Sequence, residues 1–378
     1  MWLAYVLTFY MIFILLVFNS DTRIKYSRAP GSVIGMKTPE LISFVMAFGA
    51  LCIMSLFRGI HVGSDTISYV QFYNYVENFT SYTKVFIATR MEPGFVLYVR
   101  VLVRLFHNPQ SVIICSSAIT MFFVMRFICK YSKVTWLSIF IFYCLFFNTS
   151  MNVMRQFLAL SFVLWAFDYI LKKKFIIFSA LVLLATTFHF SAFIFFIAYP
   201  LSKLKVTKKI IVLSVIFAPF VLIMSYVIMS PFLEFMAEGD FLSYYDKDNK
   251  YYAEGVKIAT ILLLIMYTFF VCYGLAGWKI MEKRRVPMNQ IDSTMLFFLI
   301  VGVFITLFSL PLNILNRFAL YFNIFGIAFL PNTIHQFAKR QPVAGHIVVG
   351  VLLLSLYYLV INVYRPEWTH IYPYSFYE

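Results

Sequence analysis

Charged side chains are scarce in this chain of 378 residues. Asp, Glu, Lys and Arg together make up only 12% of it, whereas hydrophobic residues make up 62%. Soluble domains carry about 25% charged residues, so the composition argues against a water-soluble globule. The mean hydropathy of +0.84 and the long, continuous apolar runs indicate an all-α, polytopic helical membrane protein.

Cysteine is also sparse, and its spacing is uninformative. The five cysteines lie in or beside apolar runs, and none forms a CxxC pair. We therefore expect small core residues rather than a disulfide framework or a thiolate metal site. Near His189 no second histidine or carboxylate stands at metal-ligand spacing, so we expect no zinc site there.

Twelve apolar runs are candidate transmembrane helices. They cover roughly residues 1–19, 39–57, 111–128, 134–148, 151–171, 175–188, 189–201, 210–230, 257–278, 292–309, 316–334 and 344–362. The first run lacks a basic start and a cleavage site, so we expect a retained helix. The short pair 175–188 and 189–201 forms either two tilted spans or one broken re-entrant element.

The run 93–106 differs from these twelve because it carries Arg100 and Arg104. Each arginine at mid-bilayer would cost about 2.5–3.5 kcal/mol on insertion scales. We therefore predict a short re-entrant or interfacial helix there.

Basic residues predict the orientation. Most of the 31 basic residues lie in six short connections, which all fall on one side of the twelve-span arrangement. By the positive-inside rule that side is cytoplasmic. The net charge of +15 is then mainly an orientation signal, and we expect no nucleic-acid partner. The prediction is a single integral membrane domain over 1–378, with outer-face loops 58–110 and 231–256.

Two of the remaining arginines lie at the predicted outer ends of apolar runs. Arg155 follows Asn152 and precedes Gln156, and Arg317 follows Asn316. Ionisable residues at membrane depth usually face a cavity or a partner, although snorkelling to the headgroups stays open. Because arginine binds diphosphate oxygens through two parallel hydrogen bonds, a diphosphate is the ligand that this pattern favours.

Two carboxylates and a histidine lie on the same predicted side. Asp65 is either a helix N-cap or a general base, and Glu92, before Pro93, is either a first-turn acid or a base. His189, between two short runs, is either a packing residue or a proton shuttle or phosphate donor.

Tyrosines accompany the acidic residues of the loop 231–256. This loop is either a solvated acidic surface or a sugar-facing one, since tyrosine rings stack on sugar faces. Its Asp246-Lys247-Asp248 triplet is weak evidence for a metal–diphosphate motif. The candidate sugar contacts are Tyr69, Tyr244, Tyr245, Tyr251 and Tyr252.

Five stretches together resemble the EpsG-like branch of the Wzy-type polysaccharide polymerases. They are Arg58-Gly59 with Gly63-Ser64-Asp65 and Tyr69, Glu92-Pro93-Gly94-Phe95, Asn152 with Arg155-Gln156, His189-Phe190-Ser191-Ala192, and Asn316-Arg317 with Tyr321. They run in the expected order and cover about residues 58–321. Their order, spacing and common predicted side carry the resemblance.

The resemblance implies a glycosyltransferase of the bacterial inner (cytoplasmic) membrane. Such an enzyme joins oligosaccharide repeat units carried on undecaprenyl diphosphate into an exopolysaccharide, capsule or O-antigen chain, with its active site toward the periplasmic side. The implied partners are lipid-linked oligosaccharides, membrane lipid, and a flippase and chain-length regulator of the same pathway. By family analogy the site consists of Arg58, Asp65, Glu92, Arg155, Gln156, His189, Arg317 and Tyr321.

We predict roles for these residues in glycosyl transfer. Asp65 is the first choice of general base, and His189 and Glu92 are the second choices. No metal or other cofactor is expected, because arginines can neutralise the leaving group. The predicted diphosphate-binding residues are Arg58, Arg90, Arg155, Gln156, Arg317 and Tyr321.

Two other functions stay open. A lipid-linked oligosaccharide flippase or other transporter would also bind diphosphate, but it should have a polar pathway open to both sides, often with internal repeats, and the sequence shows no repeat. A glycan ligase of the same lipid-diphosphate chemistry is barely distinguished from a polymerase by sequence.

Overall fold

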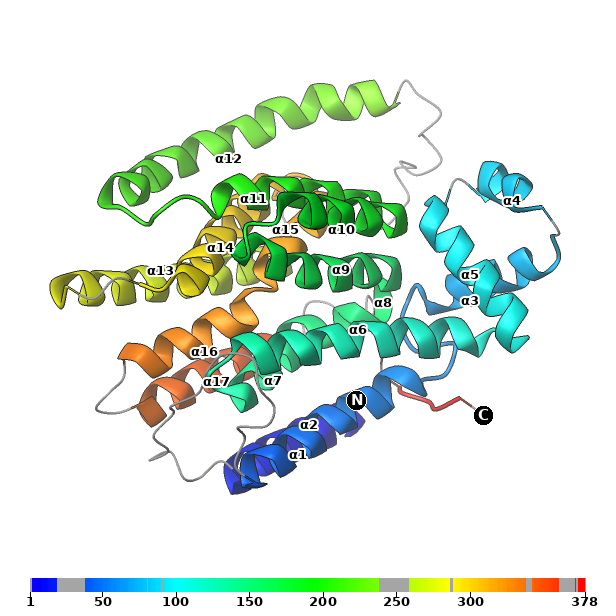
Figure 1. The fold of residues 1–378 in the computed structure, drawn as a ribbon, viewed down its shortest axis with the longest axis horizontal. Helices are drawn as coiled ribbons and strands as arrows, with labels where there is room; N and C mark the ends of the chain where they lie inside the picture. The colour runs from blue at the N-terminus through cyan, green and yellow to red at the C-terminus, as the bar shows by residue number, and fades with distance from the viewer. Residues whose placement is uncertain are drawn as a thin grey trace. The chain divides into compact units, whose positions relative to one another are not determined.

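The protein is all-helical, as the sequence predicts (Figure 1). The computed structural model describes residues 2–18, 38–79, 81–89, 91–237, 258–285, 288–337, 342–359, 371 and 373–377. Within these residues there is no β-strand, and the one extended pairing is an isolated bridge between Arg58 and Phe376.

The chain divides into two compact units, Met1–Phe196 with Ile334–Glu378, and Ile197–Thr333. The first unit holds α1 (Trp2–Phe18), α2 (Thr38–Leu56), α3 (Thr66–Glu77), α4 (Tyr82–Thr89), α5 (Pro93–Phe106), α6 (Gln110–Tyr131), α7 (Thr135–Phe142), the π-helix η2 (Tyr143–Phe147), α8 (Asn148–Asn152), α9 (Met154–Leu171), α10 (Phe175–Phe188), the 3-10 helix η3 (Phe190–Ile197) and α17 (Pro342–Tyr358). In this unit α9 packs against α10 and α6, and α2 against α1 and α6.

The second unit is built around α14, which contacts α11, α12, α13 and α15. Its elements are α11 (Ala198–Leu201), α12 (Lys208–Ala237), α13 (Ile258–Lys283), α14 (Gln290–Phe308), η6 (Asn313–Leu315), α15 (Asn316–Asn323) and α16 (Gly326–Phe337), whose last turn continues beyond the unit.

Five helices in the described part of the chain are long and apolar enough to cross a membrane. They are Gln110–Tyr131, Met154–Leu171, Lys208–Ile228, Ile258–Lys283 and Gln290–Phe308. Shorter apolar helices cover Leu3–Ile14, Glu40–Leu56, Phe175–Phe188, Phe190–Leu201 and Val348–Tyr358. Helices therefore form in all twelve predicted runs, but the count of about twelve membrane spans is not confirmed.

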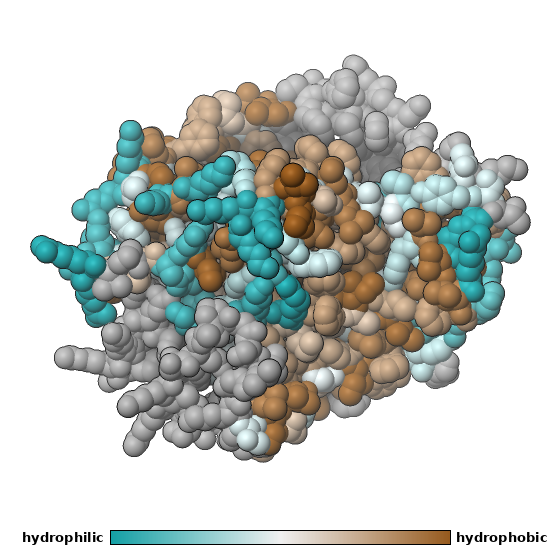
Figure 2. Space-filling view, in the orientation of Figure 1, coloured by the Kyte–Doolittle hydropathy of each residue, from teal (hydrophilic) through white to brown (hydrophobic). Residues whose placement is uncertain are grey.

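Apolar side chains cover much of the viewed surface (Figure 2). On α12, Val215, Ile216 and Ile223 are all more than half exposed, and Ile176 on α10 is more exposed still. An apolar surface of this extent needs an apolar environment, which agrees with a membrane protein.

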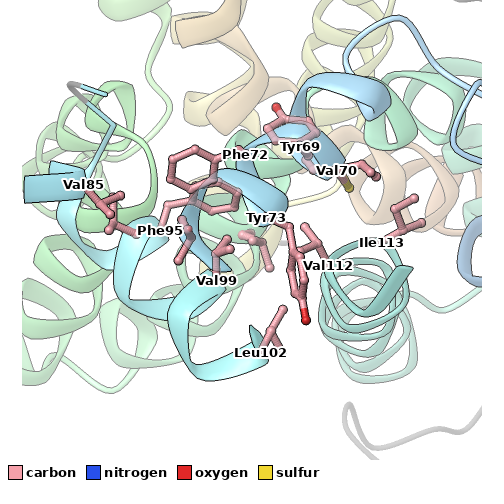
Figure 3. Close-up of a cluster of buried hydrophobic side chains, with 14 residues drawn as sticks. Tyr69, Val70, Phe72, Tyr73, Val85, Phe95, Val99, Leu102, Val112 and Ile113 are labelled. Carbon is pink, nitrogen blue, oxygen red and sulfur yellow. The ribbon is translucent and has the colours of Figure 1, made fainter. Parts of the chain in front are cut away.

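The segment 58–110, predicted as an outer loop, folds into α3, α4 and α5. These helices and the start of α6 enclose a cluster of buried side chains in which Phe72 and Phe95 stack with ring centroids 5.7 Å apart (Figure 3). Complete burial of a phenylalanine contributes about 1.5–3 kcal/mol. The cluster fixes the position of α5 and therefore that of Glu92, which directly precedes this helix.

The run 93–106 forms the amphipathic helix α5. Its buried side chains are Phe95, Val96, Val99 and Leu102, and its exposed ones include Leu97, Val101, Leu105 and Phe106. An exposed apolar stripe on an amphipathic helix suits a membrane interface. The helix is confirmed, and its interfacial or re-entrant placement stays a prediction.

Candidate functional site

Glu92, Arg155 and His189, which are far apart in the sequence, meet in the first unit. One carboxylate oxygen of Glu92, Oε2, forms an ion pair with Nη1 of Arg155. The other, Oε1, lies 2.9 Å from Nδ1 of His189. The three side chains are 16–24% exposed, so they are shielded from bulk solvent but still reachable. We call them the Glu92 triad.

Each member of the triad lies at a helix end that its local sequence explains. Glu92 precedes α5 in an extended conformation, and Pro93 occupies the first helical position, where its missing N–H is not needed. Val153 (φ −89°, ψ 60°) separates α8 from α9, so Arg155 lies in the first turn of α9. His189 is extended (φ −157°, ψ 116°) between α10 and η3. The helical structure is therefore interrupted at His189.

Gly94 allows two of these helix ends to come close together. A Cβ at this position would lie 2.2 Å from Oγ1, 2.7 Å from Cβ and 2.9 Å from the carbonyl oxygen of Thr187, in the last turn of α10. Since Thr187 directly precedes Phe188 and His189, this close approach brings Glu92 within reach of His189.

The charges of the triad keep Glu92 ionised. Burial alone would raise the pKa of Glu92, but the hydrogen bond with His189 and the positive charge of Arg155 outweigh it and lower that pKa from 4.5 to about 2. An ionised carboxylate only accepts hydrogen bonds, so Nδ1 of His189 must be the donor. Neutral His189 then presents Nε2 as a proton acceptor.

The guanidinium of Arg155 has further partners on α3 and α5. The Tyr69 side chain interacts electrostatically with it, and its Cζ lies 5.9 Å from the centre of the Phe95 ring. Its Nε is buried and has no hydrogen-bond partner among the described residues. Arg155 is therefore held in place while one charged N–H donor remains unused.

The loop that carries Asp65 is anchored to the residues just before α9. Oδ1 of Asn152 accepts hydrogen bonds from the backbone N–H of Ser64 (2.7 Å) and from its hydroxyl (3.2 Å). Gly63 has a φ of +99°, where a side chain would be strained, and a Cβ there would lie 3.0 Å from Oδ1 of Asn152. Asp65 is half-buried, and its Oδ1 lies 3.4 Å from the Ser64 hydroxyl, whose one proton it shares with Asn152.

Arg58 is placed differently from Arg155. It is completely buried, and its guanidinium donates to the carbonyl of Ser55, to the Ser117 hydroxyl (2.8 Å) and to the carbonyl of Met151 (3.2 Å). These contacts join α2, α6 and α8. They favour a structural role, so Arg58 is not among the groups that we propose to touch the substrate.

The other predicted residues fall into three groups. Tyr69 and Gln156 are buried in the first unit, with Tyr69 in the cluster of Figure 3. Arg317, half-buried at the start of α15, and Tyr321, fully buried in the same helix, belong to the second unit. Their convergence with Arg155 stays a prediction. Arg90, Tyr244, Tyr245, Tyr251 and Tyr252 lie outside the described residues.

Sequence reasoning missed two supporting residues. Asn152 and Gly94 were part of the resemblance, but their roles as loop anchor and as close-approach glycine are visible only in the fold. In the sequence, only their positions point to them: Asn152 stands three residues before Arg155, and Gly94 stands two residues after Glu92. Within the described residues, no group of three histidines, cysteines or carboxylates could hold a metal ion.

Replacement of Gly94 by alanine should separate α5 from α10. The added Cβ would collide with the Thr187 backbone as well as its side chain, so we expect a melting temperature lower by several degrees, from a loss of about 1–3 kcal/mol, together with loss of activity. Gly49→Ala is the matched control, because a Cβ there meets nothing within 4 Å. Equal melting temperatures for the two variants would contradict the proposed close approach.

The low pKa of Glu92 predicts a pH dependence of stability. Because the pKa is about 2 in the folded protein and 4.5 ordinarily, the ionised carboxylate stabilises the fold fully above about pH 5 and less as the pH falls toward 2. The difference in melting temperature between wild type and Glu92→Gln should therefore be constant from pH 7 to 5 and shrink below that. If the difference in melting temperature between the two proteins stays the same down to pH 3, Glu92 does not have a low pKa.

The EpsG family model matches residues 41–376, most of the chain. The matched range contains the Glu92 triad, the Asp65 loop and both residues of α15 that the sequence predicts for the site. No curated protein and no solved structure matches the chain.

Proposed function

The chain belongs to the EpsG family, and from this premise we propose that it is a polysaccharide polymerase acting on undecaprenyl-diphosphate-linked oligosaccharide repeat units. The family supports a polymerase-like glycosyltransferase role in a membrane. The lipid diphosphate, the periplasmic side of the active site and the product as an exopolysaccharide, capsule or O-antigen chain are parts of the proposal.

The observation that carries the proposal is the Glu92 triad, in which a carboxylate orients the partly exposed Arg155 side chain. One carboxylate is shared between Arg155 and His189, and the Arg155 side chain is 24% exposed. A partly buried guanidinium of this kind is well suited to a diphosphate, whose oxygens accept several charge-assisted hydrogen bonds. Arg317, in the other unit, is predicted from the sequence alone as a second guanidinium for the diphosphate.

In the proposed reaction, an acceptor hydroxyl oxygen of the new lipid-linked unit attacks the anomeric carbon of the growing chain. A C–O bond forms there as the bond to the lipid diphosphate breaks, and the electron pair leaves with the diphosphate. Arg155 and Arg317 stabilise the negative charge that develops on it. A general base removes the proton from the acceptor hydroxyl.

The three candidate bases differ in their contacts. Both oxygens of Glu92 are engaged, Oε2 by the Arg155 guanidinium and Oε1 by Nδ1 of His189, and its pKa is about 2, so Glu92 is suited to hold Arg155 and His189 rather than to accept a proton. Asp65 has no ion-pair partner among the described residues and remains our first choice. His189, oriented by Glu92 with Nε2 as acceptor, is the second.

The decisive test of the function uses purified protein in lipid nanodiscs. Given only lipid-linked repeat units, a polymerase makes a ladder of products. An unchanged substrate would contradict the proposal, and would favour a flippase, which moves the substrate, or a ligase, which needs another acceptor.

Arg155→Ala should abolish the ladder, because it removes a charge that stabilises the leaving group; single donors of this kind contribute about 10²–10³-fold. Arg155→Lys should restore only part of the activity, since lysine lacks the planar fork. Arg104→Ala is the matched control, because Arg104 is exposed in the last turn of α5. Membrane insertion and melting temperature are measured for each variant, and equal ladders from Arg155→Ala and Arg104→Ala would remove Arg155 from the site.

Chemical rescue should identify the base. Loss of a general base costs about 10²–10⁴-fold, so Asp65→Ala should be strongly impaired, and added formate should restore part of the rate. If His189 is the base instead, imidazole should rescue His189→Ala while Asp65→Ala stays active. Undiminished polymer length from Asp65→Ala would exclude Asp65.

A further inference from the structure

The C-terminal segment 373–377 is bound to the start of the loop that carries Asp65. The backbone N–H of Gly59 donates to the carbonyl of Ser375 (2.8 Å), and that of Tyr377 donates to the carbonyl of Phe57 (2.9 Å). These two bonds flank the antiparallel bridge between Arg58 and Phe376. We call this segment the C-terminal strap. Figure 1 shows the chain end in red beside the end of α2.

The strap makes contacts beyond the bridge. The Tyr374 hydroxyl donates to the carbonyl of Met54 in the last turn of α2 (2.6 Å). Gly59 permits the close approach, because a Cβ there would lie 2.6 Å from the Ser375 hydroxyl and 3.3 Å from the carbonyl of Phe376. Backbone pairing of this kind resembles the addition of a strand to a sheet edge.

The loop between α2 and α3 is thus fixed at both ends by segments distant in the sequence. The strap holds Phe57 and Gly59 at the first end. Asn152, just before α9, holds Ser64 at the other. Asp65 follows Ser64 directly, next to the second of these attachments.

We propose that the C-terminal strap is a positioning element of the glycosyl-transfer site, which acts through the Phe57–Ser64 loop to place Asp65. This inference rests on the proposed function. The strap contacts neither Asp65 nor the Glu92 triad in any described hydrogen bond, so its effect passes through the loop. Misplacement of a reacting group by about 1 Å costs about 10²-fold in rate, which makes an attachment outside the site important for catalysis.

The test compares two replacements of Tyr377 in the full chain. Tyr377→Pro removes the side chain and the backbone donor to Phe57, whereas Tyr377→Ala removes only the side chain. The kcat for ladder formation should fall at least about tenfold in Tyr377→Pro and at most about twofold in Tyr377→Ala, with little change in KM for the lipid-linked unit. Equal kcat values would overturn the proposal.

Two further measurements separate positioning from a merely structural role. Hydrogen exchange should be faster in residues 57–64 of Tyr377→Pro than of Tyr377→Ala, with α9 unchanged. Asn152→Ala combined with Tyr377→Pro should lower kcat by less than the product of the two single effects, because both act on one loop. Multiplicative effects, or unchanged exchange, would contradict the proposal.

A failure of the proposed polymerase function can be told apart from a failure of the strap's positioning role. If wild-type protein makes no ladder, the polymerase activity and the positioning role are both wrong. The exchange experiment then still reports whether the strap holds the loop, since it does not depend on turnover.

Discussion

The carboxylate of Glu92, shared between Arg155 and His189, is the interaction on which the rest of the site depends. It joins the N-terminal ends of α5 and α9 to the break after α10. A partly buried ionisable side chain without a partner costs folding free energy, whereas each side chain of the triad has a hydrogen-bond partner within it. The buried cluster of Figure 3 and the close approach at Gly94 support this contact from outside.

Each end of α9 has one carboxylate that contacts two basic side chains, but the surroundings of the two groups differ. Near the far end of the helix, Asp168 is almost completely buried and is paired with Arg126, Lys130 and the Tyr131 hydroxyl. Asp168 lies 13 positions after Arg155, which is roughly 20 Å along a helix. At the Glu92 end, by contrast, a buried N–H of Arg155 is left without a partner. The Glu92 end also holds His189, and the Asp65 loop is anchored just before it through Asn152; this is the end of α9 that we expect to bind a diphosphate.

The sequence predicted the helical class, the helix at 93–106 and the family, because these depend on apolar runs and short motifs. It also selected Glu92, Arg155 and His189, but it ranked Asp65 first as base and could not show that Glu92 holds the other two. That role depends on a 2.9 Å contact between residues 97 positions apart, which no local pattern encodes. The burial of Arg58 and the strap at Ser375 and Tyr377 were missed for the same reason, since both are long-range contacts. The twelve-span count assumed that every apolar run crosses the bilayer, although several of the helices are short.

The most direct test of the central claim is equilibrium binding of a short-chain prenyl diphosphate to the purified protein in nanodiscs. Wild type should bind the diphosphate saturably, and the affinity should fall at least about tenfold in Glu92→Gln, where Arg155 and His189 lose their common anchor. A prenyl alcohol of the same chain length should not compete. Equal affinity of wild type and Glu92→Gln for the diphosphate, or equally tight binding of the alcohol, would contradict the central claim.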